Sequence, residues 1–170
     1  GQSHENHDWS DREVIIANVT RTNFTNISFD SVLLSDDTDE IIFDNISVRP
    51  SNSTGMSLYN HIGRITIRDS FFNQSFSTSP VFLIRNTNDV VSIENSEFYA
   101  HEYGANPILH DVWTGKLNIS GCRFENHDPD DNGQILTLAR NSDTYLVDNI
   151  IKAYGGRAIY FVVFSGTCNT

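Results

Sequence analysis

The sequence of 170 residues contains few cysteines, few basic side chains and no long apolar run, and each scarcity argues against a class of protein. Two cysteines, Cys122 and Cys168, cannot form the disulfide framework of a small scaffold, so apolar packing has to stabilise the fold. Acidic residues outnumber basic residues 22 to 11, which argues against nucleic acid or an anionic membrane as the main partner. The longest apolar run, residues 158–164, is far shorter than the roughly 20 residues that span a bilayer, so no membrane insertion is expected.

The chain is rich in the Asn-x-Ser/Thr triplet, which is the acceptor for N-linked glycans. It occurs at Asn18, Asn23, Asn26, Asn45, Asn52, Asn73 and Asn118. Composition alone would give about three such triplets, so the excess favours a glycosylated protein of the secretory pathway. The predicted location is therefore secreted, extracellular or at the cell surface. The alternative is a chain rich in Asn, Ser and Thr because its turns require them.

Three segments superpose without gaps at an even interval of about 26 residues: RITIRDSFFNQ (64–74), VVSIENSEFYA (90–100) and KLNISGCRFEN (116–126). Their common apolar position is occupied by Ile67, Ile93 and Ile119. Slightly shorter steps backwards reach Phe43 and Val19, and a slightly longer step forwards reaches Val147. The chain is therefore predicted to contain six repeats.

Each position of the repeat has its own chemistry. Two residues before the common position the side chains are apolar (Ala17, Ile41, Ile65, Val91, Leu117, Tyr145), and one residue after it they are polar (Thr20, Asp44, Arg68, Glu94, Ser120, Asp148). This alternation predicts a strand with one face on a core and one face in water. Turn-forming residues come next (Arg21, Asn45, Asp69, Asn95, Gly121, Asn149), followed by an aromatic-rich column (Phe24, Val48, Phe72, Phe98, Phe124, Lys152).

The order of these features predicts an all-β parallel solenoid. A strand, a one-residue turn, a short strand, a loop and a second apolar strand make one coil, which buries its inner face only when it stacks on its neighbours. A β-sandwich would explain the alternation, but it would not explain one residue type recurring at a fixed period.

On these residues the chain resembles the right-handed parallel β-helices of the pectin-lyase-like superfamily. The column of Asn45, Asp69, Asn95 and Asn149 is similar to that family's asparagine ladder, and the Phe column to its internal aromatic stack. The resemblance covers residues 14–164. It implies one right-handed β-helix at 13–170, after a polar segment at 1–12, with about six coils of about 24–28 residues each. A weaker likeness, on Gly155-Gly-Arg-Ala-Ile159, is to the repeats of polymorphic outer-membrane adhesins.

Enzymes of the resembled family cleave acidic polysaccharides with carboxylates and a basic residue on one outer face. The comparable column here, which contains Asp44, Arg68 and Glu94, alternates in sign instead of gathering acids. The chain is therefore predicted not to be an enzyme. A polysaccharide lyase-type or hydrolase-type fragment, and a sugar- or protein-binding adhesin module, are the alternatives.

Two further features have open interpretations. Asp128, Asp130 and Asn132 match the start of a calcium loop, but Ala139 stands where that loop needs a bidentate Glu. No cofactor is expected, with calcium as a weak alternative. Cys122 is expected to point inward, in the column of Ser70 and Ser96; a Cys122–Cys168 disulfide and two unpaired thiols both remain open.

The ends of a solenoid expose unpaired backbone groups, onto which further strands can add. The side chains expected at these ends are Trp9, Val14, Ile15, Ile159, Phe161 and Phe164. The predicted function is a non-enzymatic, N-glycosylated structural protein whose copies associate head to tail into a fibre. A longer solenoid is the alternative. Glycans are expected at Asn18, Asn23, Asn73 and Asn118, and Asn45 is the sequon least suited to carry one because its side chain turns towards backbone.

Overall fold

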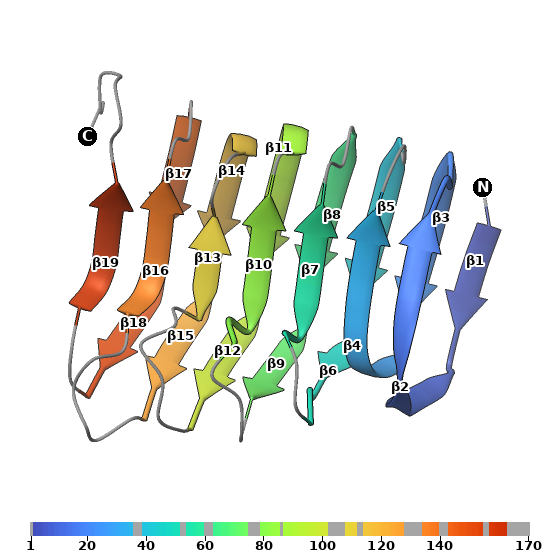
Figure 1. Ribbon diagram of the computed structural model, residues 1–170, viewed down its shortest axis with the longest axis horizontal. Helices are drawn as coiled ribbons and strands as arrows, with labels where there is room; N and C mark the ends of the chain where they lie inside the picture. Colours follow the sequence, from blue (N-terminus) through green and yellow to red (C-terminus); the bar gives the residue numbers. More distant parts are fainter. Residues whose placement is uncertain are drawn as a thin grey trace.

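The computed structural model describes residues 2–35, 39–51, 54–59, 63–74, 79–85, 87–101, 108–111, 114–127, 134–139, 143–154 and 157–162. Every regular element within these ranges is a β-strand, and every strand pair is parallel. The strands stack along one axis from the N-terminus to the C-terminus (Figure 1). β10 and β13 lie in front with arrows pointing up, while the strands of the β1 sheet lie behind and run down, so the coils advance as a right-handed helix. The predicted all-β parallel solenoid is confirmed.

One face of the solenoid, the first sheet, has seven strands within the described residues. They are β1 (Gln2–Glu5), β3 (Arg21–Thr25), β5 (Glu40–Asp44), β8 (Arg64–Arg68), β11 (Thr87–Glu94), β14 (Thr114–Ser120) and β17 (Asp143–Val147). The chain thus passes through this face once more than the six predicted repeats.

The other strands form two further faces, which are joined at the N-terminal end. β2 (Asp8–Ala17) and β4 (Ser28–Ser35) are long enough to run from one face into the other. The short-strand face continues through β6 (Ser47–Val48), β9 (Phe71–Gln74), β12 (Glu97–Ala100), β15 (Arg123–Asn126) and β18 (Ile150–Ala153). The third face continues through β7 (Met56–Tyr59), β10 (Phe82–Arg85), β13 (Leu109–Asp111), β16 (Gln134–Ala139) and β19 (Arg157–Val162).

The strand register confirms the middle of the predicted repeat and corrects both ends. Phe43, Ile67, Ile93 and Ile119 pair in succession and are buried. Phe24, not Val19, pairs with Phe43, and Leu146, not Val147, pairs with Ile119. Val147 points outward and is 51% exposed. The predicted steps were wrong because the connection from the short-strand face to the third face varies in length from coil to coil, whereas burial fixes the register.

The same shifts move the neighbouring columns at the two ends. Thr22 and Thr144 take the inward places predicted for Ala17 and Tyr145, and Tyr145 is half exposed. On the outward side, Thr25 and Val147 replace Thr20 and Asp148 beside Asp44, Arg68, Glu94 and Ser120. In the aromatic column, Phe29 and Ile151 replace Phe24 and Lys152.

The corner between the first sheet and the short-strand face is one left-handed residue in every coil. Asn6, Asn26, Asn45, Asp69, Asn95, Gly121 and Asp148 have φ between 47° and 62°. Asn and Asp tolerate this conformation better than other side chains, and Gly has no Cβ to clash. The predicted turn column is confirmed at its four middle members, whereas Arg21 and Asn149 are replaced by Asn26 and Asp148. Gly121 is needed because a Cβ there would lie 2.6 Å from Oδ1 of Asn95.

Stacked rings fill the interior beside this corner. Phe72, Phe98 and Phe124 are parallel, with ring centroids 4.6 Å and 4.7 Å apart. This distance matches the strand spacing of about 4.8 Å, so each ring contacts the ring of the next coil without strain. Cys122 is buried in the column of Ser70 and Ser96, as predicted, and burial raises the pKa of its thiol to about 11.

The segment predicted as a polar N-terminal stretch at residues 1–12 contributes strands to the solenoid. β1 pairs with β3, and β2 pairs with β4 along both adjoining faces. The inward positions of residues 2–9 are Gln2, His4, His7 and Trp9, so this part of the first coil lacks the aliphatic pattern of the other coils, which returns at Val14 and Ile16 of β2. His4 stacks on Phe24 at 5.2 Å, and Trp9 packs against Phe29 at 5.6 Å.

Replacing Ile93 by Asp tests the interior register. Ile93 is fully buried between Ile67 and Ile119, so a carboxylate there has no partner and we expect a loss of more than about 4 kcal/mol of unfolding free energy. The neighbouring Ser92→Asp change, on the outward side of the same strand, should cost less than about 1 kcal/mol. Chemical denaturation of both variants is the measurement, and equal losses would contradict the register.

Candidate functional site

The outer surface of the short-strand face carries the densest group of charged side chains among the described residues. At its centre is Glu125 on β15, whose side chain is only 6% exposed although it points away from the core. Arg123 Nη2 lies 2.5 Å and Lys152 Nζ lies 3.1 Å from Oε1 of Glu125, and His127 Nε2 lies 3.1 Å from Oε2. Three cationic or hydrogen-bonding groups on β15, its C-terminal flank and β18 therefore converge on one carboxylate.

These contacts define the electrostatics of Glu125. Burial acts to raise the pKa of this carboxyl, but hydrogen bonds from Lys152, Arg123 and His127 outweigh burial, and the pKa is lowered. The carboxylate is therefore ionised and held by its neighbours. A general acid needs a raised pKa to retain its proton at neutral pH, so the lowered pKa of Glu125 does not suit that role. Its ion pair with Lys152 instead links two adjacent coils.

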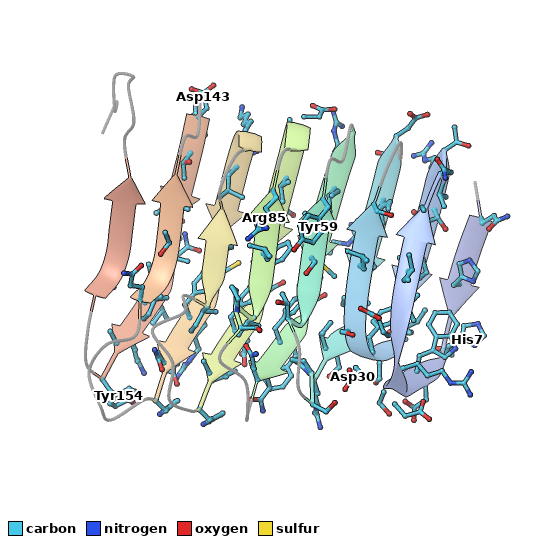
Figure 2. The ribbon with its side chains drawn as sticks, in the orientation of Figure 1. His7, Asp30, Tyr59, Arg85, Asp143 and Tyr154 are labelled. Carbon is cyan, nitrogen blue, oxygen red and sulfur yellow. The ribbon has the colours of Figure 1, made fainter. Side chains whose placement is uncertain are left out.

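An aromatic column runs beside this group on the same outer surface. The imidazoles of His101 and His127 stack at 5.1 Å, and the ring of His127 stacks on Tyr154 at 4.7 Å. Tyr154 lies at the lower edge of the last coil in Figure 2 and is 62% exposed. The Tyr99 hydroxyl donates to Glu97, and the pKa of Tyr99 is raised, first by burial and then by this bond. The faces of His101 and His127 contact neighbouring rings, so the column presents ring edges and polar groups to water, and Tyr154 at its end is the ring best exposed to stack on a planar or sugar ring.

The outer face of the first sheet is the surface that the family resemblance marks for catalysis. Arg68 Nη2 lies 2.7 Å from Oδ2 of Asp44, and the hydrogen bond to Asp44 raises the pKa of Arg68. Arg21 and Glu40 form a second ion pair at 2.8 Å. The described acids on this face thus include two carboxylates that are held by arginines from adjacent coils, an arrangement that joins coils to each other.

The two terminal coils differ from the rest in what they expose. His7, labelled in Figure 2, stacks on Trp9 at 4.9 Å, and residues Asp8 to Arg12 line a polar depression at the N-terminal end. At the other end, Tyr145, Val147, Ile150, Tyr154 and Ile159 are exposed. Of the side chains predicted at the ends, Ile15 is exposed and Trp9 and Val14 are partly buried, while those of Phe161 and Phe164 lie outside the described side chains.

The sequons fall into two groups. Asn23 on β3, Asn73 on β9 and Asn118 on β14 point outward from strands, and Asn18 is in an exposed left-handed turn after β2. Oδ1 of Asn73 is buried, and Nδ2 of Asn118 donates to Oγ of Ser92 in a long hydrogen bond of 3.4 Å. Asn26 and Asn45 are corner residues: Nδ2 of Asn45 donates to Oδ1 of Asn26 at 2.6 Å, and Nδ2 of Asn26 donates to Oδ1 of Asn6 at 3.2 Å. Asn52 lies outside the described residues.

The remaining predictions concern metal and disulfide. Asp128, Asp130 and Asn132 lie outside the described residues, so the calcium loop stays a hypothesis. No cluster of three or more His, Cys, Asp or Glu side chains that could hold a metal occurs in the part of the chain that the structure describes. Cys122 is a free thiol here, with Sγ 3.3 Å from the carbonyl oxygen of Ser120, and Cys168 lies outside the described ranges.

Sequence reasoning missed the group around Glu125 and the column of His101, His127 and Tyr154. A signal was present, because His101 and His127 are one repeat of 26 residues apart, and Glu125 occupies the place that Tyr99 has in the repeat before it. The repeat that aligned the core therefore also aligns these outward side chains.

Comparisons with known proteins give no family. No family model, no curated protein and no solved structure matches this chain. Within the described residues no helix is long and apolar enough to cross a membrane.

The contacts of Glu125 predict a pH dependence. Because its pKa is lowered in the folded protein, its contribution to stability is present at neutral pH and is lost as the pH falls below the ordinary glutamate value of about 4.3. We expect Glu125→Gln to lower the melting temperature at pH 7 by a few degrees, a shift that corresponds to roughly 1 kcal/mol in a domain of this size. The difference from the unsubstituted protein should shrink towards pH 3. Glu94→Gln, at an exposed position, is the control, and a gap that stays constant with pH would contradict the role of the charge.

The two groups of sequons predict unequal glycan occupancy. A glycan on Asn26 or Asn45 would occupy the amide nitrogen that donates along the corner, whereas Asn18, Asn23, Asn73 and Asn118 are outside this ladder. Site-resolved glycopeptide mass spectrometry should therefore find higher occupancy at the second group. Higher occupancy at Asn45 than at the exposed Asn23 would count against the assignment.

Proposed function

We propose that this protein is a non-enzymatic, N-glycosylated structural protein outside the cell, whose copies associate end to end into a fibre. One observation carries the proposal. All six large apolar side chains that are exposed among the described residues belong to the two terminal coils, Ile15 to the first and Tyr145, Val147, Ile150, Tyr154 and Ile159 to the last. Exposed apolar side chains gathered at one place mark a surface that contacts another molecule.

The backbone at both ends supports the same function. β1 pairs only with β3 and β2 only with β4, and at the other end β17, β18 and β19 each pair on one side within the described residues. Such edges can accept further parallel strands. Because the first and last coils are different surfaces, their contact is heterologous and does not close, which generates a fibre.

The sides of the solenoid are suited to glycans and ion pairs. Asn23 and Asn118 point outward from the first sheet, each one coil in from an end, so sugars there would project to the side of the solenoid and would not cover the end coils. The ion pairs Arg21–Glu40 and Arg68–Asp44 join adjacent coils on the same face. This arrangement supports a structural over a catalytic role.

A second candidate function is favoured by the column of Tyr99, His101, His127 and Tyr154. Its stacked rings next to the charged group around Glu125 would suit a sugar or a protein ligand, as in an adhesin module. The end surfaces contain more exposed apolar side chains than this column, and for this reason fibre formation is the primary proposal.

Sedimentation velocity over a range of protein concentrations tests the proposal. We expect species larger than the monomer that grow with concentration. The test variant combines Val147→Glu with Ile150→Glu. If the outward columns continue from one copy into the next, the added carboxylates would lie beside Glu5 and Asp8 of the next copy, so association should weaken at least about tenfold. Both positions are half exposed, so folding should be retained.

The matched control is Thr66→Glu, on the outer face of a middle coil, which should assemble like the unsubstituted protein. A protein that stays monomeric at millimolar concentration would overturn the proposal, as would a double variant that assembles normally.

A further inference from the structure

We propose that two copies meet with the last coil of one on the first coil of the next in a single register, as if the solenoid continued across the junction. This inference rests on the proposed end-to-end assembly and specifies which residues meet. The partner is a second copy of this chain. The argument comes from the columns of the interior and from the direction of hydrogen bonds at the corner.

The interior columns of the two end coils match in polarity at four of the five positions compared. The strand pairs, followed from coil to coil, connect each inward residue of the first coil to one inward residue of the last coil. The five columns compared run from Gln2 to Thr144, from His4 to Leu146, from His7 to Asn149, from Trp9 to Ile151 and from Val14 to Ile159. Stacked in register, Gln2 meets Thr144 and His7 meets Asn149, so two polar positions of one end meet the two polar positions of the other. Trp9 and Val14 meet aliphatic side chains, and the imidazole ring of His4 meets Leu146. A polar group would otherwise be buried against an apolar surface at a cost.

Asn149 shows how the polar pair would be used. Its Oδ1 accepts from the backbone N–H of Cys122 at 2.8 Å, and its Nδ2 donates to the carbonyl of Ile119 at 2.9 Å. An amide side chain has further donor and acceptor capacity. His7, in the same column of the first coil, has the ring nitrogens to match it.

The corner ladder has a direction, and this direction selects the partner residue. Nδ2 of Asn45 donates to Asn26 and Nδ2 of Asn26 donates to Oδ1 of Asn6, so donors point towards the N-terminal end. The bond to Asn6 uses its oxygen and leaves its Nδ2 for an acceptor in a coil placed before the first. The last coil has Asp148 at this corner, with the same left-handed backbone (φ 54°). A carboxylate only accepts, so Asp148 of one copy would receive a charge-assisted hydrogen bond from Asn6 of the next.

The backbone can continue across the same junction. Along the corner, the backbone N–H of each left-handed residue donates to a carbonyl in the next coil. The acceptor is the residue just before that coil's own left-handed residue, as from Asn6 to Thr25 and from Gly121 to Val147. The bond at the junction would run from Asp148 N–H to the Glu5 carbonyl of the next copy. If two last coils met each other instead, their strands would lie antiparallel. The parallel hydrogen-bonding pattern of the three faces would then not continue from one copy into the next.

The first experiment exchanges the two corner residues. Asn6→Asp places two carboxylates at the junction and should weaken association about tenfold in sedimentation equilibrium. The new carboxylate can still accept from Asn26, so the fold is retained. Adding Asp148→Asn returns a donor to the junction, and the double variant should recover to within about threefold of the unsubstituted protein. Thr66→Asp, which adds a carboxylate on the outer face of a middle coil, should leave association unchanged.

The second experiment reads the register by cross-linking. In the proposed register Ser3 lies beside Tyr145 of the neighbouring copy at the strand spacing of about 4.8 Å, within the Cα separation that a disulfide spans. Oxidised Ser3→Cys/Tyr145→Cys should form covalent chains of copies, whereas Ser3→Cys/Val147→Cys, two residues out of register, should not. Tyr145→Cys alone should stay uncoupled.

The outcomes separate the two proposals. An unsubstituted protein that never associates overturns both the fibre and the register. A protein that associates, but without rescue in the double variant or with cross-links through Tyr145→Cys alone, overturns the register and leaves end-to-end assembly standing.

Discussion

The left-handed residue at one corner of every coil is the constraint on which the rest of this structure depends. It turns the chain between two faces in a single residue, so the corner cannot absorb an insertion and each coil arrives at the same place above the last. The Asn and Asp side chains there tolerate the backbone conformation and, at Asn6, Asn26 and Asn45, also bond to each other along the axis. The variable loops lie elsewhere in the coil, where extra length leaves the register unchanged.

Two stacks follow from this fixed corner. The Phe rings of the short-strand face repeat at the strand spacing, and the buried column beside them replaces aliphatic side chains with Ser70, Ser96 and Cys122. The hydroxyl of Ser96 accepts from the backbone N–H of Ser70 and donates to the carbonyl of Glu94. The polar column thus satisfies backbone groups that the corner leaves without a strand partner.

The middle of this fold could be predicted from sequence, and the ends could not. Ile67, Ile93 and Ile119 recur at an even interval because the two connections of each coil compensate: from one coil to the next, one becomes a residue longer and the other a residue shorter. Spacing and burial therefore agree there. At Phe24 and Leu146 the coils have other lengths, 19 residues from Phe24 to Phe43 and 27 from Ile119 to Leu146, so steps judged from spacing alone reached Val19 and Val147 instead. The first coil escaped notice because Gln2, His4 and His7 occupy inward positions close to water, where apolar patterning is not required. The group around Glu125 includes Arg123 and His127 of the same coil and Lys152 of the next coil. The contact with Lys152 depends on how the last coil pairs with the coil before it, which the sequence repeat predicted wrongly.

End-to-end continuity of the columns is the central claim, and helical reconstruction of assembled material by electron cryomicroscopy tests it most directly. Seven strands in the first sheet at about 4.8 Å each predict an axial rise of roughly 34 Å per copy, with unbroken strand spacing across every junction. Filaments with another rise, or single particles under all conditions of concentration, would contradict the account.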